Sequence, residues 1–221
     1  MVSSQPMNRY PMCRYLFPLL LALAVVRPAV AADDLARVRR FLTTLESLQG
    51  EFVQHATNRA THTTQEAMGS VWIERPARVR WHYTQPAPQD VLIDGERMWV
   101  YSAELEQVVV RRLAAGELAR TPLAFLAGLA SLDDLYAMEA LPAAPHPEEL
   151  RLLLTPKGKD SSFQSVSLRL KRDDLALLGM EVVDTVGNLT AIAFHGLKLN
   201  QPVDPAHFAL DLPSGTQRID Q

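Results

Sequence analysis

Cysteine is nearly absent from this chain of 221 residues, and the single one, Cys13, lies close to the N-terminus. It precedes an apolar run and does not follow a leucine and small residues at the end of that run, so it is a poor site for lipid attachment. If the N-terminal segment is removed, the remaining chain has no cysteine. Such a chain is compatible with an oxidising compartment and takes no stability from disulfides.

Long apolar runs are missing as well. The run from Tyr15 to Val26 spans about a dozen residues, whereas a helix that crosses a membrane needs about 20. Arg9 and Arg14 precede this run, and Ala29-Val30-Ala31 supplies the small-x-small pattern of a cleavage site. These features predict a secretory signal peptide over residues 1–31 that is cut after Ala31, and no stable insertion in a membrane.

An excess of positive charge is also absent. The predicted signal peptide carries three arginines and no acidic residue, so its removal changes the formal net charge from −3 to −6. An acidic protein is not expected to bind nucleic acid non-specifically. The remaining residues, 32–221, have a length typical of one domain with a substantial core.

Motifs of catalysis are missing too. The six histidines are scattered, and no pair has the i, i+4 spacing of a helical metal site. There is no G-x-S-x-G elbow and no glycine-rich phosphate loop. The sequence therefore predicts a protein that is not an enzyme and has no cofactor or metal. A lipid hydrolase stays an alternative if a histidine, a carboxylate and a serine converge in the fold.

An amphipathic helix is predicted near the start of the exported domain. Asp33 and Asp34 can cap it. Apolar residues then recur every three or four positions, at Leu35, Val38, Phe41, Leu42, Leu45 and Leu48, which is typical of a helix with one apolar stripe. Gly50 is expected to end the helix, and Glu51 to Thr57 to continue as a strand.

Strand patterns dominate the rest of the chain. Between Arg78 and Tyr83 the residues alternate, with Val79, Trp81 and Tyr83 on a face that needs an apolar partner, either protein or ligand. Asp94-Gly95 predicts a hairpin turn. Further strands are expected over residues 91–93, 98–101, 107–111, 150–155, 166–171, 178–183 and 189–194. Successive hairpins without a helical crossover favour a mainly β fold with a single, strongly curved antiparallel sheet.

One apolar segment interrupts these strands. Thr121 at the cap, Pro122 at the first helical position and Gly128 at the end delimit a short helix that includes Leu123, Phe125 and Leu126. A helix that is apolar all round must be covered on most sides. It is either an ordinary core helix or a lid over an apolar hollow.

Several short motifs occur in a specific order along the exported domain. After the amphipathic helix come F-x-Q, E-R-P with a tryptophan five residues on, D-G-x3-W-x-Y, T-P-L, L-T-P-K and V-D-x3-F, which begin at Phe52, Glu74, Asp94, Thr121, Leu154 and Val203. In this order the chain resembles the LolA family, the periplasmic carriers of outer-membrane lipoproteins, from about Asp34 to Gly215.

The resemblance implies an open half-barrel whose mouth is covered by an N-terminal helix and short apolar helices. It implies a monomer in the periplasm that takes lipoproteins from the inner-membrane exporter LolCDE and passes them to the outer-membrane receptor LolB. Arg75 corresponds to the family arginine whose hydrogen bonds hold the lid shut. The residues that the resemblance places around the acyl chains are Leu42, Leu45, Leu48, Val79, Trp81, Val91, Leu123, Phe125 and Leu126.

A second function is compatible with the same half-barrel. It could sense a lipid or an unfolded envelope protein for regulation. Such a sensor is expected to carry an added C-terminal domain, and this chain stops soon after Gly215. We therefore expect a carrier.

Overall fold

The computed structural model describes residues 29–114, 117, 124–128, 132–141, 146–158 and 161–221, and the side chains of all of these except 29–32 and 124–125. Nearly all of the predicted signal peptide lies outside the described residues. Its last three residues form the start of the first helix, α1, and the cleavage after Ala31 stays a prediction.

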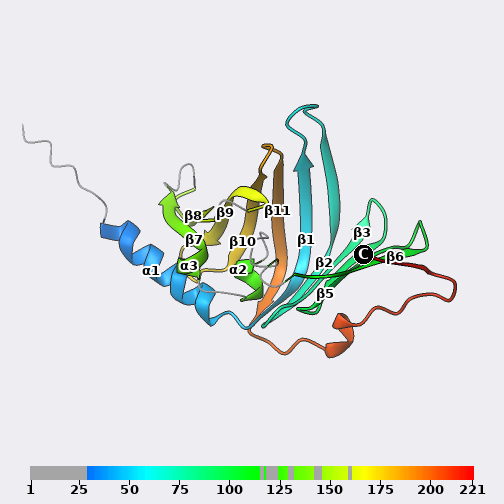
Figure 1. The fold of residues 1–221 in the computed structure, drawn as a ribbon. Coiled ribbons are helices and arrows are strands. Elements are labelled where there is room, and N and C mark those ends of the chain that lie inside the picture. The colour runs from blue at the N-terminus through cyan, green and yellow to red at the C-terminus, as the bar shows by residue number, and fades with distance from the viewer. Residues whose placement is uncertain (1–28, 115–116, 118–123, 129–131, 142–145, 159–160) are drawn as a thin grey trace, which may run out of the picture.

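The described residues form one sheet of twelve strands, in the order β12-β6-β5-β4-β3-β2-β1-β11-β10-β9-β8-β7. The sheet is strongly curved (Figure 1), and its neighbouring strands are antiparallel except β12, which runs parallel to β6. This confirms the predicted fold class. The strands are β1 (Ser47–Thr57), β2 (Thr64–Glu74), β3 (Arg78–Gln85), β4 (Gln89–Ile93), β5 (Arg97–Ser102), β6 (Gln107–Arg112), β7 (Tyr136–Leu141), β8 (Glu149–Pro156), β9 (Phe163–Lys171), β10 (Leu177–Asp184), β11 (Leu189–Leu199) and β12 (Gln217–Asp220).

The helices gather on the concave side of the sheet (Figure 1). They are α1 (Ala29–Thr44), α2 (Ala124–Ala127) and α3 (Leu132–Leu135). Leu42 of α1 and Leu126 of α2 are completely buried and belong to the same core as Phe52 of β1. The apolar stripe of the amphipathic helix therefore packs on the inner face of the sheet, as its spacing requires.

The first helix begins and ends earlier than predicted: it starts at Ala29, so Asp33 and Asp34 lie within it and do not cap it. It ends at Thr44, so Leu48 lies in β1 and not on the helix, although its side chain is fully buried. Asn200 decides this end: its amide donates to Thr44 O (3.3 Å) and its Oδ1 accepts from Glu46 N (2.7 Å). Gly50 does not end the helix but lies within β1, where a Cβ atom would be only 2.9 Å from His195 O of β11.

The outer face of the sheet is covered by the chain that follows β11. The short 3-10 helix η2 (Pro205–Phe208) packs on it, with the His207 ring stacked on Trp72 at 4.3 Å. Arg80 donates to His207 O (3.1 Å) and to Asp90 (2.7 Å), and His82 Nδ1 contacts the same Asp90 oxygen (2.9 Å). His82 is thus part of a polar network on the outer face of the sheet.

A glycine in the middle of the sheet lets two aromatic rings meet. Phe52 on β1, Gly69 on β2 and Tyr83 on β3 are partners in register. Because Gly69 has no side chain, the rings of Phe52 and Tyr83 contact each other edge to face across it, with centroids 5.2 Å apart. A Cβ atom at Gly69 would lie 1.9 Å from His82 O.

We predict that Gly69→Ala destabilises the protein by about 1–3 kcal/mol, because the added methyl group meets rigid backbone. The free energy of unfolding in urea measures this. Gly158→Ala is the matched control, since no atom of the described residues lies within 4 Å of the added Cβ, and its effect should stay within about 0.5 kcal/mol. Equal stability of the two variants would contradict the close approach of β2 and β3.

Candidate functional site: an apolar hollow in the curved sheet

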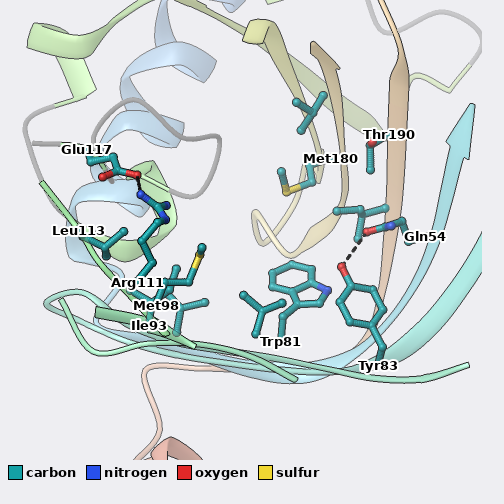
Figure 2. Close-up of a pocket in the computed structure, with 14 residues that line it drawn as sticks. Gln54, Trp81, Tyr83, Ile93, Met98, Arg111, Leu113, Glu117, Met180 and Thr190 are labelled. Carbon is teal, nitrogen blue, oxygen red and sulfur yellow. Dashed lines mark hydrogen bonds and ion pairs between the residues drawn. The ribbon is translucent and has the colours of Figure 1, made fainter. Parts of the chain in front are cut away.

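The curvature of the sheet encloses a hollow of about 310 Å³ on its concave side. One wall comes from β3 to β6 and the segment after them, and the opposite wall from β10, β11 and β1 (Figure 2). The described residues that line it are Gln54, Val79, Trp81, Tyr83, Val91, Ile93, Met98, Arg111, Leu113, Glu117, Met180, Val182, Thr190 and Ile192. Most are apolar, so the hollow suits an alkyl chain or another apolar ligand.

Three of the sequence-predicted residues lie on the wall of this hollow: Val79, Trp81 and Val91. They are adjacent because Val79 pairs with Ile93 and Trp81 with Val91 across β3 and β4. Tyr83, the third member of the predicted apolar face, lines the hollow as well.

The other predicted lining residues are placed elsewhere or are not described. Leu42, Leu45, Leu48 and Leu126 are buried in the core beside the hollow and are not part of its wall. They belong to the core cluster in which the helices pack on the concave face of the sheet. Leu123 and the side chain of Phe125 lie outside the described residues.

Trp81 is the largest side chain of the wall. Its ring packs on Phe52 with centroids 4.9 Å apart and meets the edge of Phe194 at 6.4 Å. The side chain is buried, and its Nε1 has no hydrogen-bond partner among the described residues. An indole N–H usually finds an acceptor when it is buried, so this group is exceptional.

The hollow is polar at both ends and apolar between them (Figure 2). At one end the Tyr83 hydroxyl donates to Gln54 Oε1 (3.3 Å), near Thr190. Burial raises the pKa of Tyr83 and outweighs the hydrogen bond with Gln54, which lowers it. The net change is upward, so the phenol stays neutral at physiological pH. At the other end Arg111 forms an ion pair with Glu117.

Arg75 joins the sheet to two of the helices that cover it, α1 and α2. Its Nε donates to Leu126 O of α2 (3.0 Å) and its Nη1 to Thr43 O of α1 (3.4 Å). Burial lowers the pKa of Arg75, but an arginine stays charged in proteins. Carbonyl groups at a helix end lack partners within the helix and are favourable acceptors for a cation. The helices are thus held by a charged group at the end of β2.

The glycine after α2 makes room for this arginine. Gly128 has a φ of +68°, in the left-handed region that ends many helices. A Cβ atom there would lie 2.4 Å from Arg75 Cδ. The predicted helix end at Gly128 is confirmed, and the residue also allows the arginine side chain to cross the end of α2.

The opposite wall of the hollow was not predicted. Met180, Val182 and Ile192 were recognised only as parts of strands, about 100 positions away from Trp81. Their strand patterns carried no information on how far the sheet curves. Arg111 and Glu117 gave no signal of a site either.

Other kinds of site find no support in the described part of the chain. The residues that line the hollow there include neither histidine nor serine. Among the described residues no group of three or more histidine, cysteine, aspartate or glutamate side chains could hold a metal ion. In the same part of the chain no helix has the length and apolar character needed to cross a membrane.

The comparison with known families agrees with this geometry. The family model described as "Outer membrane lipoprotein carrier protein LolA" matches residues 43–211. The chain belongs to the LolA family. This confirms the resemblance seen in the order of its motifs.

Individual relatives of the LolA family cover almost the whole chain. An outer-membrane lipoprotein carrier protein of Alkalilimnicola ehrlichii is 34% identical over 92% of this chain and 94% of its own. One from Xanthomonas campestris is 37% identical over 82% and 85%. A solved structure of an uncharacterised conserved protein from Thermus thermophilus covers 86% of this chain and 98% of its own with a TM-score of 0.52, and at 14% identity it supports the fold alone.

We predict that an apolar ligand enters the hollow beside Trp81. The double variant Trp72→Phe, Trp99→Phe leaves Trp81 as the single tryptophan of the protein. A brominated fatty acid should quench its fluorescence at low ligand concentrations. The control variant Trp72→Phe, Trp81→Phe keeps only Trp99. This residue lies on the outer face, because it pairs in register with Leu92, whose side chain points away from the hollow that its neighbours Val91 and Ile93 line. Trp81 emission that the ligand leaves unchanged would show that the hollow does not take up alkyl chains.

Proposed function

We propose that the protein is a periplasmic carrier that binds the acyl chains of outer-membrane lipoproteins and shields them from water. The apolar hollow beside Trp81, in a chain of the LolA family, is the observation that carries this proposal. Burial of an acyl chain stabilises it by about 0.8 kcal/mol per methylene. A lipid anchor with several chains therefore cannot cross an aqueous compartment uncovered.

The hollow is too small for a complete anchor while the helices are in place. An engineered cavity of about 150 Å³ holds one benzene ring, so a hollow of about 310 Å³ offers room for about a dozen carbon atoms by the same measure. One long acyl chain already exceeds this. We infer that α1 and α2 move away from the concave face, and that the chains then replace Leu42, Leu45 and Leu126 against Leu48 and Phe52.

This exchange explains how a carrier can release its cargo. In the empty protein the helices fill the concave face themselves, so that lipid replaces one apolar contact with another and the net affinity stays modest. Arg75 adds to this effect. Each hydrogen bond from a charged group contributes about 1.5–3 kcal/mol, so the bonds to Leu126 and Thr43 together offset the burial of roughly four to eight methylene groups. The bond to Thr43 is long, which favours the lower figure.

A modest net affinity for lipid suits a protein that receives its cargo from one membrane partner and passes it to another. We propose that the protein, as a monomer, receives lipoproteins from the inner-membrane exporter LolCDE and passes them to the receptor LolB. Uptake opens the lid, and closure of the lid on Arg75 favours release. The predicted signal peptide over residues 1–31 is consistent with export to the periplasm.

Depletion of the protein tests the proposed function directly. Outer-membrane lipoproteins should accumulate at the inner membrane, as measured by fractionation of the two membranes. A copy of the gene supplied in trans should restore their location. Correct sorting in depleted cells would exclude the carrier function and would leave a sensor of lipid or envelope stress as the alternative.

We predict that Arg75→Leu leaves the fold and lipid uptake intact and slows transfer to LolB. Without the guanidinium the closed state loses its hydrogen bonds to α1 and α2, so bound lipid is held more tightly. The rate of lipoprotein transfer from the purified variant to LolB measures this.

Arg78→Leu is the control for this experiment. Arg78 lies three residues further along the chain, forms an ion pair with Glu74 and stacks over Phe208 on the outer face. Its replacement removes the same charge without affecting the lid, so transfer should stay normal. Normal transfer by the Arg75 variant as well would remove this arginine from the release mechanism.

A further inference from the structure

The indole N–H of Trp81 is a hydrogen-bond donor in the wall of the hollow. The side chain is 5% exposed, and Nε1 has no partner among the described residues. The ring is held in place by Phe52 and Phe194. Figure 2 shows the nitrogen turned toward the end of the hollow that holds Tyr83 and Gln54. A donor fixed in this way is arranged to meet an acceptor that comes with the ligand.

A second donor lies at the same end. Gln54 Oε1 accepts a hydrogen bond from the Tyr83 hydroxyl, so the amide NH2 is the part of this side chain that remains to donate. Gln54, Tyr83 and Trp81 all line the hollow. This end therefore offers neutral donors and carries no charge, which suits a neutral acceptor such as a carbonyl oxygen.

The opposite end is less suited to such an acceptor. Arg111 is the strongest donor in the hollow, but it forms an ion pair with Glu117, whose second carboxylate oxygen accepts from Ala114 N (2.9 Å). A ligand carbonyl would have to compete with a carboxylate for the guanidinium. At the uncharged end, no acceptor among the described residues competes with a ligand carbonyl for the Trp81 N–H.

We propose that Trp81 and Gln54 form a polar subsite for the ester carbonyl oxygens of the lipid anchor. The Trp81 N–H donates to an ester carbonyl, and Gln54 donates to the same or a neighbouring one. The alkyl chains then extend from this subsite over Val91 and Met98 toward Leu113. The subsite fixes the direction in which the lipid lies, and it distinguishes acylated glycerol from a plain hydrocarbon. This inference rests on the proposed function.

The test compares two synthetic lipopeptides that differ only at the carbonyl groups. One carries diacylglyceryl-cysteine with ester links, and the other carries the same alkyl chains through ether links. The wild-type protein should bind the ester lipopeptide roughly 5- to 10-fold more tightly, which corresponds to one hydrogen bond. Trp81→Phe keeps an aromatic ring but removes the N–H, so its preference for the ester lipopeptide should be clearly smaller than that of the wild-type protein, with Gln54 as the donor that remains.

Two control variants locate the effect. Trp99→Phe makes the same chemical change on the outer face of the sheet and should keep the preference for the ester. Arg111→Met removes the donor at the opposite end and should keep it too. Loss of the preference in Arg111→Met but not in Trp81→Phe would overturn the assignment. Equal affinity of the wild-type protein for both lipopeptides would overturn it as well.

A spectroscopic measurement covers the case in which Trp81→Phe does not fold. In the variant Trp72→Phe, Trp99→Phe the single indole N–H resonance should move downfield on addition of the ester lipopeptide and not of the ether lipopeptide. The same change with both ligands, or with neither, would contradict the subsite. If neither lipopeptide binds to any of the variants or to the wild-type protein, the proposed function fails, and this outcome is distinct from binding without preference.

Discussion

The whole structure depends on keeping the concave face of one sheet out of water. The sheet has twelve strands among the described residues and curves because several strand pairs shift register, as β-bulges do. Its inner face is apolar along most strands. No second sheet covers that face in the described part of the chain, so the task falls to two short helices and the longer α1. Because these helices pack on the sheet and are not hydrogen-bonded into it as strands are, they can also move away from the sheet.

The attachments of this cover lie at its ends. Arg75 donates to Thr43 O near the end of α1 and to Leu126 O of α2, and Asn200 caps the end of α1. Near the start of α1, Asp34 forms an ion pair with Arg172, and Arg37 donates to Arg172 O. The polar bonds of α1 lie toward its ends, and apolar contacts lie between them. This arrangement allows α1 to be displaced and an apolar ligand to take the place of its apolar stripe on the sheet.

The two faces of β3 have separate tasks. Val79, Trp81 and Tyr83 form the wall of the hollow, whereas Arg80 and His82 hold Asp90 and the chain that follows β11 on the outer face. Because adjacent residues of a strand point to opposite faces, one stretch of six residues serves both. The outer covering leaves the inner face free for the hollow.

The sequence by itself determined the local features. The alternation from Arg78 to Tyr83 gave the two faces of β3, Asp94-Gly95 gave a hairpin, and the spacing from Leu35 to Leu45 gave the apolar stripe of α1. The faces and the stripe rest on periods of two and 3.6 residues, and the hairpin rests on the turn preference of two adjacent residues, all of which neighbours in the chain encode. The family also followed from the order of short motifs, and Arg75 was singled out from it.

Only the tertiary structure decided the rest. The end of α1 is set by Asn200, which lies 154 positions after Glu46, and Leu48 consequently belongs to a strand. The curvature of the sheet brought Met180 and Ile192 opposite Trp81 and left Leu42, Leu45 and Leu126 in the core. It also left the Trp81 N–H without an acceptor among the described residues. Such contacts depend on strand register and on segments that meet only in the folded chain, so the local periodicity of the sequence cannot predict them.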